Sequence, residues 1–94
     1  MPEVHIPTML RALTGGRATV EAAGATVREI IEDLERRFPG LRDRLTDGAR
    51  LRPNLSVAVD GEVSPLGLRE TVGPSSEVHF VAAIKGGKTR NASA

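Results

Sequence analysis

One stretch of the chain has apolar residues at spacings of three and four, which is the period of an amphipathic helix. The apolar positions are Val27, Ile30, Ile31, Leu34 and Phe38. Thr26 stands just before this stretch and Glu29 follows three residues later, which is the spacing of a capping box. In that motif the Thr hydroxyl accepts a hydrogen bond from a backbone amide, and the Glu carboxylate accepts one from the Thr amide. Pro39 and Gly40 then stop a helix. The pattern therefore predicts one main helix from residue 26 to about residue 38.

Shorter segments alternate between apolar and polar residues, or are rich in β-branched residues, and these features predict strands. The expected strands are residues 3–10, 17–22, 55–59, about 62–63 and 77–84. Pro7 cannot donate a ladder hydrogen bond, so its position must be unpaired or irregular. Gly15-Gly16 predicts a hairpin turn between the first two strands, and Asp60-Gly61 predicts a tight turn between the third and fourth.

The remaining segments are expected to connect these elements. Residues 41–45 are predicted to form a short helical turn, residues 46–53 a polar loop, and residues 64–74 a connection with at most one helical turn around residues 68–72. One helix with one apolar stripe needs one sheet face to cover. The chain is therefore predicted to be an α+β protein with a mixed sheet of four to five strands packed on one main helix.

The last expected strand leads directly into Gly86-Gly87, and residues 88–94 follow. Two glycines in succession have no Cβ atoms, so they make a thin segment that is able to enter a narrow tunnel in a partner protein. On the pair of glycines alone, a flexible junction between strand and tail is the favoured explanation. The domain division that follows is a folded unit over residues 1–85 and a flexible tail over residues 86–94.

A strand that ends in Gly-Gly resembles the ubiquitin-like sulfur carriers of thiamin, molybdopterin and cysteine biosynthesis. The opening Val4-His5-Ile6-Pro7-Thr8-Met9-Leu10-Arg11 is similar to the first strand of the cysteine-forming branch, and the likeness spans residues 3–87. It implies the β-grasp fold of ubiquitin, with the first and last strands parallel and adjacent at the centre of the sheet. Val78, Phe80, Ala82 and Ile84 would then face the helix, and His79, Val81 and Ala83 would face outward.

The resemblance also implies a function. The terminal carboxylate of Gly87 would be adenylated by a ubiquitin-activating-type enzyme or sulfurtransferase that uses ATP, and would become a thiocarboxylate that gives its sulfur to an acceptor synthase. Because Lys88 follows Gly87 here, the chain would first be cut between these residues by a zinc metallopeptidase that removes residues 88–94. The chain itself would be no enzyme, would hold no cofactor or metal, and would be a monomer when free.

Two other functions stay open at this point. A ubiquitin-like protein modifier would join Gly87 to a lysine through an amide bond, and a β-grasp binding module would keep residues 88–94 and use the Gly-Gly pair for nothing. The final sulfur acceptor is open as well: an activated serine derivative, a cofactor precursor or a secondary metabolite all fit. A terminus made by cloning would also explain residues 88–94.

Three further groups of residues were weighed as sites. An apolar patch of Val57, Val59, Val81 and Ala83 on the outer sheet face is a candidate docking surface for the activating enzyme. His5 and His79 would be close if the terminal strands pair, but without a neighbouring carboxylate they are interpreted as ordinary strand residues. The arginines between residues 36 and 52 alternate with acids and are interpreted as a solvated mixed-charge face, not as a nucleic-acid site.

Composition narrows the remaining choices. The chain has 94 residues, enough for one small domain, and Phe38 and Phe80 are its only aromatic residues, so the core must be aliphatic. It has no cysteine, and therefore neither a disulfide nor a thiolate, which favours the cytoplasm. Thirteen basic and twelve acidic residues argue against a general polyanion binder. No apolar run has the length of a membrane span or the form of a signal peptide.

Overall fold

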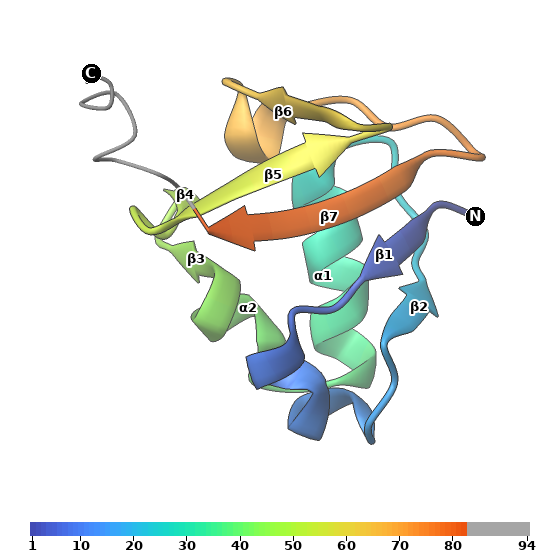
Figure 1. The fold of residues 1–94 in the computed structure, drawn as a ribbon, viewed down its shortest axis with the longest axis vertical. Coiled ribbons are helices and arrows are strands. Elements are labelled where there is room, and N and C mark those ends of the chain that lie inside the picture. Colours follow the sequence, from blue (N-terminus) through green and yellow to red (C-terminus); the bar gives the residue numbers. More distant parts are fainter. Residues whose placement is uncertain (83–94) are drawn as a thin grey trace, which may run out of the picture.

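In the computed structural model, which describes residues 1–82, five strands form one mixed sheet in the order β2-β1-β7-β5-β6 (Figure 1). These strands are β1 (Glu3–His5), β2 (Thr19–Glu21), β5 (Leu55–Val59), β6 (Glu62–Ser64) and β7 (Glu77–Ala82). β1 is antiparallel to β2 and parallel to β7, and β5 is antiparallel to both β7 and β6. The first and last strands therefore lie side by side at the middle of the sheet, as the resemblance implied.

The main helix, α1 (Val27–Arg37), begins and ends where the sequence predicts. The Thr26 side chain accepts a hydrogen bond of 3.2 Å from the backbone amide of Glu29, which is the first half of a capping box. The second half differs from the expectation, because the Glu29 carboxylate accepts from the amide of Ala25, at 2.8 Å, and not from that of Thr26. Both contacts still satisfy amides that would otherwise be unpaired at the start of the helix.

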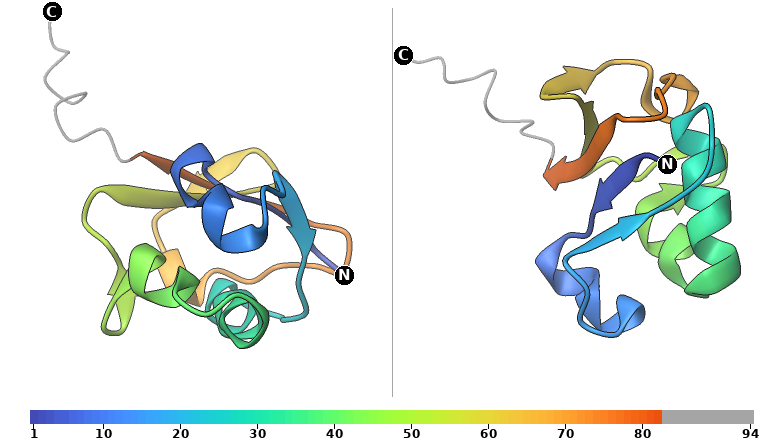
Figure 2. Two further views of the ribbon diagram at one scale, coloured as in Figure 1. Left: turned by 90° about the horizontal axis from the view of Figure 1, so that it is seen from below. Right: turned by 90° about the vertical axis from the view of Figure 1, so that its right-hand side faces the viewer.

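α1 packs across one face of the sheet, and the aliphatic core lies between them (Figure 2). The helix contributes its apolar stripe and the sheet contributes the inward positions of its central strands. The buried residues on these two sides are Val27, Ile30, Ile31 and Leu34 on α1 and Val4, Val57, Val78 and Phe80 on the sheet. Because each side has only one apolar face, neither element is stable without the other.

The opening strand is shorter than predicted. β1 ends at His5, and the 3-10 helix η1 (Thr8–Thr14) occupies most of the segment that alternation had assigned to a strand. Pro7 has no amide to continue the ladder, and its carbonyl oxygen accepts from the amide of Leu10 at 2.9 Å, which starts the helix. The connection to β2 is therefore a helical turn closed by Gly15 and Gly16, both with positive φ, and not a two-residue hairpin.

The segment predicted as a polar loop, residues 46–53, contains a small second sheet of β3 (Thr46–Asp47) and β4 (Arg50–Leu51). It follows α2 (Leu41–Leu45), which the sequence predicts correctly as a short helical turn. Leu51 packs against the core, so burial of one apolar side chain holds a segment that otherwise looks polar. The later connection holds one 3-10 turn, η2 (Gly67–Arg69), slightly earlier than the expected residues 68–72.

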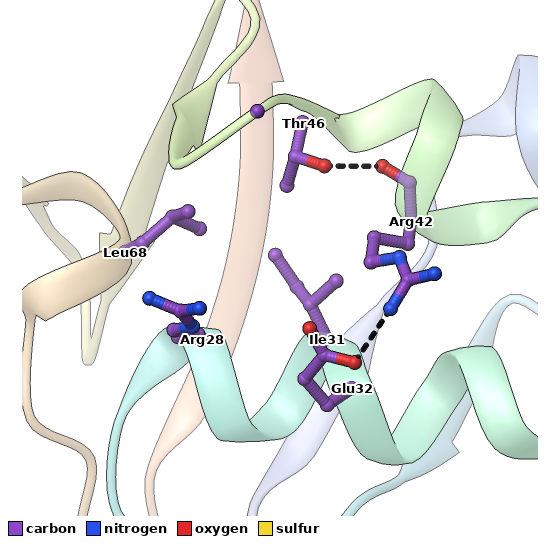
Figure 3. Close-up of a pocket in the computed structure, with 7 residues that line it drawn as sticks. Arg28, Ile31, Glu32, Arg42, Thr46 and Leu68 are labelled. Carbon is purple, nitrogen blue, oxygen red and sulfur yellow. Dashed lines mark hydrogen bonds and ion pairs between the residues drawn. The ribbon is translucent and has the colours of Figure 1, made fainter.

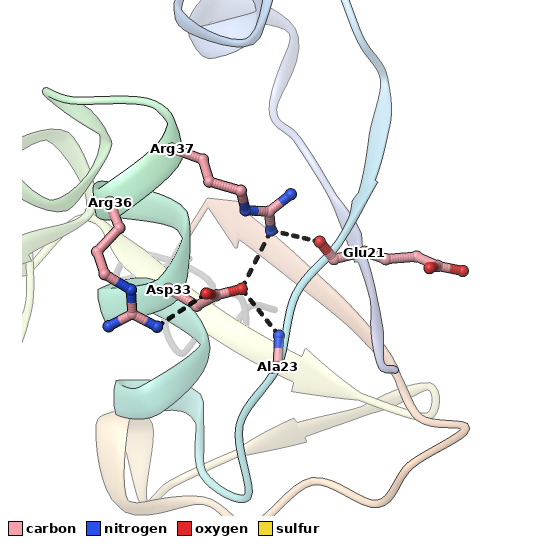
Figure 4. Close-up of polar contacts among 5 residues, drawn as sticks. All are labelled: Glu21, Ala23, Asp33, Arg36 and Arg37. Carbon is pink, nitrogen blue, oxygen red and sulfur yellow. Dashed lines mark hydrogen bonds and ion pairs between the residues drawn. The ribbon is translucent and has the colours of Figure 1, made fainter.

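Asp33 joins α1 to the edge of the sheet (Figure 4). One carboxylate oxygen accepts from the backbone amide of Ala23 at 2.9 Å, and the other accepts from Arg36 at 2.8 Å. Arg37 contacts the first oxygen at 3.1 Å and also donates to the carbonyl oxygen of Glu21. The hydrogen bond from Ala23, followed by the contacts with the two arginines, lowers the pKa of Asp33 against a smaller opposing effect of burial.

Replacement of this carboxylate is expected to change the acid limb of the stability curve. Because the folded pKa of Asp33 lies below its unfolded value, its contribution is complete above the unfolded pKa, near 3.8, and is lost as the pH falls through the folded pKa. Asp33→Ala is expected to cost about 1–3 kcal/mol at neutral pH, since the Ala23 amide loses its acceptor, and less in acid. Urea unfolding at several pH values measures this difference. An equal cost at pH 7 and at pH 2 would contradict the assignment.

Candidate functional site

β7 carries the chain toward its Gly-Gly segment from the centre of the sheet (Figure 1). It is held by β1 on one side, from Glu77 to His79, and by β5 on the other, from Val78 to Ala82. Gly86, Gly87 and Lys88, the predicted tail and processing residues, lie outside the described residues. What the fold does position is the last described residue, Ala82, which pairs with Leu55 at the end of β5.

An open groove borders the end of β7. It is lined by Pro7, Met9, Leu10, Arg44, Arg52, Asn54, Leu55, Phe80 and Ala82. Met9 is 82% exposed, although it is a large apolar residue. Arg52, which also lines the groove, is held in place by hydrogen bonds of 2.9 and 2.7 Å from its guanidinium to the carbonyl oxygen of Asp43. The end of β7 is thus bordered by apolar surface and by cationic side chains.

The predicted docking patch is only partly on the surface, and its assignment to Val57 is wrong. Val57 is fully buried, because it shares a parity with the core-facing side of β5, and Val59 is partly buried against the same core. Val81 is 37% exposed, as expected, and its partner on β5 is Ser56. Ala83 lies outside the described residues. The outward positions of β5 are therefore Ser56 and Ala58, one residue out of phase with the alternation expected from the sequence.

A second hollow lies between α1, α2 and η2 (Figure 3). Arg42 crosses from α2 to Glu32 on α1 in an ion pair of 2.8 Å, and the Thr46 hydroxyl donates to the Arg42 carbonyl oxygen at 2.7 Å. These polar groups are satisfied by each other and not turned toward a ligand. Together with the Asp33 contacts, the ion pair fits the prediction of a mixed-charge face over the arginine-rich region.

The two histidines come together on the outer face of the sheet. His5 and His79 are register partners on β1 and β7, and their rings stack with centroids 3.8 Å apart and 10° between the planes. Their closeness agrees with the expectation from the sequence, but the presence of a carboxylate beside them does not. Glu77, two residues before His79 and therefore on the same face, supplies one. The period-two spacing of Glu77 and His79 in the sequence is the signal from which this carboxylate could have been found.

A helix held by a sheet whose first and last strands are parallel neighbours defines the β-grasp, or ubiquitin-like, class of protein. A family model of the ThiS family matches residues 4–87, so the match runs from β1 to the second glycine and leaves residues 88–94 outside it. The chain belongs to this family of ubiquitin-like sulfur carriers. Its members are carriers and not catalysts, in agreement with the prediction that the chain is no enzyme.

Individual relatives support the same placement. The chain is 34% identical to the sulfur carrier protein CysO of Mycobacterium tuberculosis, over 89% of this chain and 96% of that protein. A chain in the crystal structure of the Amycolatopsis orientalis BexX/CysO complex is 39% identical, with a TM-score of 0.84 over 92% of this chain and 99% of that one. SAMP1 from Haloferax volcanii is 25% identical, with a TM-score of 0.67 over 90% of this chain and 97% of that one.

The likeness to two CysO proteins confirms the expected cysteine-biosynthesis type of carrier. The BexX/CysO structure shows one such relative in complex with another protein. Among the helices that the structure describes, none is long and apolar enough to cross a membrane.

Proposed function

We propose that the chain carries sulfur as a thiocarboxylate on Gly87, after the bond between Gly87 and Lys88 has been cut. The observation that supports this most directly is the extent of the family match, which ends at Gly87. The last described strand before Gly87 is β7, the central strand of the sheet. In the sequence as it stands, Gly87 is joined to Lys88 by an amide and has no free carboxylate. The uncut chain is therefore a precursor.

The chemistry takes three balanced steps. Water hydrolyses the Gly87–Lys88 bond, on a zinc metallopeptidase, and releases residues 88–94 with a free carboxylate on Gly87. That carboxylate then attacks ATP on an activating enzyme, displaces pyrophosphate and becomes an acyl-adenylate. A sulfur nucleophile such as a hydrosulfide or a persulfide attacks the acyl carbon and expels AMP, and a persulfide also needs a thiol to release the sulfur. The carrier contributes an accessible carboxylate, and the partner enzymes supply the catalysis.

Transfer of the sulfur to its acceptor also takes place on a partner enzyme. A thiocarboxylate holds sulfur as a nucleophile on a protein, so delivery is controlled by docking and not by the diffusion of free sulfide. The acceptor synthase supplies an electrophilic carbon, and an activated serine derivative is the acceptor that fits a carrier of the cysteine-biosynthesis type. Docking near the end of β7 fits this role, because the groove there offers exposed Met9 and the cationic side chains of Arg44 and Arg52.

The intact mass of the protein from its native host tests the proposal. We expect a species that ends at Gly87, and beside it a second species that is heavier by the difference between one sulfur and one oxygen atom. The protein should be isolated without a tag at the C-terminus, and alkylation of the thiocarboxylate before analysis should shift only the heavier species. Growth with limited sulfur should change the ratio of the two.

Two results would overturn the proposal in different ways. A single species that keeps residues 88–94 under all growth conditions would favour a β-grasp binding module. A species that ends at Gly87 but is found joined to lysines of other proteins, with no sulfur-bearing form, would favour a protein modifier. Peptide mapping of the junction distinguishes the isopeptide from the free acid.

A further inference from the structure

On the outer face of the sheet, opposite α1, the side chains of His5, Glu77 and His79 gather around one point. From this geometry we propose that the chain binds one Zn²⁺ ion there, through two imidazole nitrogens and one carboxylate oxygen. The site joins β1 to β7, the first and last strands of the fold. It uses none of the residues proposed for the sulfur chemistry.

The distances between the three ligand atoms are close to those found around a bound zinc ion. Glu77 Oε1 lies 3.8 Å from His5 Nε2 and 3.6 Å from His79 Nε2. In a tetrahedral zinc site with bonds of about 2.0–2.2 Å, neighbouring ligand atoms are about 3.3–3.6 Å apart. All three ligand atoms already lie within 4.8 Å of one another. Rotation of the two rings out of their stack would turn both nitrogens toward a common point beside the Glu77 carboxylate.

His5 has an unsatisfied atom at this point. Its Nε2 is buried and has no hydrogen-bond partner among the described residues. The carboxylates of Glu77 and Glu3 lie 3.8 and 3.6 Å from it, too far for a hydrogen bond. A buried polar atom without a partner is unfavourable. A metal ion between these groups would satisfy the His5 nitrogen and neutralise the nearby carboxylates together.

The chemical types of the three ligands favour zinc over other metal ions. Two neutral imidazoles with one carboxylate form a donor set that zinc uses where a fourth position stays open. Glu3 or a water molecule can fill that position, because Glu3 is the register partner of Glu77 on β1. The side chains of His5 and His79 are 33% and 38% exposed, so an ion can reach the site directly from solvent. A hard cation such as Mg²⁺ prefers an all-oxygen site and is not expected to compete.

Titration of the chain with ZnCl₂ in a calorimeter tests the site. The protein must carry no polyhistidine tag, since His5 and His79 are then the only histidines present. We expect one ion per chain, and a decrease in affinity of at least about tenfold in His5→Gln, His79→Gln and Glu77→Gln. Glu62→Gln is the matched control, because it removes an exposed carboxylate from β6 outside the cluster. Thermal melting without metal shows whether each variant is folded.

A second measurement uses the unaltered chain. Co²⁺ in place of Zn²⁺ should give visible absorption bands of a four-coordinate site, and histidine NMR signals should shift for both rings at one equivalent of Zn²⁺. The alternative is that protonated His5 forms an ion pair with Glu3 and Glu77, which predicts no response of either ring to zinc. No binding at micromolar Zn²⁺, or equal binding by the two histidine variants and the unaltered chain, overturns the proposal. Because Gly87 has no part in any of these readouts, failure of the carrier function would leave them unaffected.

Discussion

A chain that ends at Gly87 is expected to be adenylated by the activating enzyme of its host, whereas the full chain of 94 residues is expected to give no product. The reason is chemical: only a free carboxylate attacks ATP, and Lys88 holds the Gly87 carbonyl in an amide. Exchange of labelled pyrophosphate into ATP measures the step. Addition of the peptidase to the full chain should restore the activity to that of the truncated chain.

Two matched variants separate the carboxylate from the shape of the segment that carries it. A chain that ends at Gly86 keeps a terminal carboxylate but moves it by one residue, and we expect it to lose the activity. Gly86→Val in the chain that ends at Gly87 adds a branched side chain, and we expect at least about a tenfold loss of kcat/KM, equivalent to ~1.4 kcal/mol. Comparable activity in the full chain and the truncated chain would contradict the precursor role.

Leu34→Ala is expected to destabilise the fold more than any surface change. Leu34 is fully buried and belongs to the apolar stripe that α1 presents to the sheet. Removal of a buried leucine side chain costs about 2–5 kcal/mol, because transfer energy is lost and a cavity remains. A domain of this size has a total stability of about 5–15 kcal/mol, so the loss would be a large fraction of it. Urea unfolding followed by circular dichroism measures the change.

Leu66→Ala is the matched control, since Leu66 is the same residue type but 47% exposed. We expect its effect to stay within about 0.5–1 kcal/mol. The slope of unfolding free energy against urea should be the same in both variants if only the native core has changed. Equal effects at the two leucines would show that the contact between α1 and the sheet is not the main source of stability.

The main helix could be predicted from sequence because its signals are local. The stripe from Val27 to Phe38 gives its face, and Thr26 and Pro39 give its ends. The signals for the third strand and its turn are equally local. Asp60 and Gly61 both adopt the positive φ that a tight turn needs. The parallel pairing of β1 with β7 was not local, and it was available only through the family resemblance.

The errors arose where distant contacts decide the local structure. Residues 46–53 look polar, but Leu51 reaches the core and two short strands form around it. Residues 8–10 alternate like a strand, yet Pro7 ends the ladder and a 3-10 helix follows. Val57 was placed on the outer face because alternation gives the period of a strand and not which of its two faces is covered.

The sequence by itself determined the chemistry that the chain is able to offer: a Gly-Gly segment, no cysteine, and one helix with a single apolar stripe. These follow from residue identity and from spacings within one element. Only the tertiary structure decided which side chains meet, because strands far apart in sequence are joined by backbone pairing in one register. That register sets His5 beside His79 and places Glu77 next to both. The candidate zinc site therefore depends on a contact between the first and last strands of the fold.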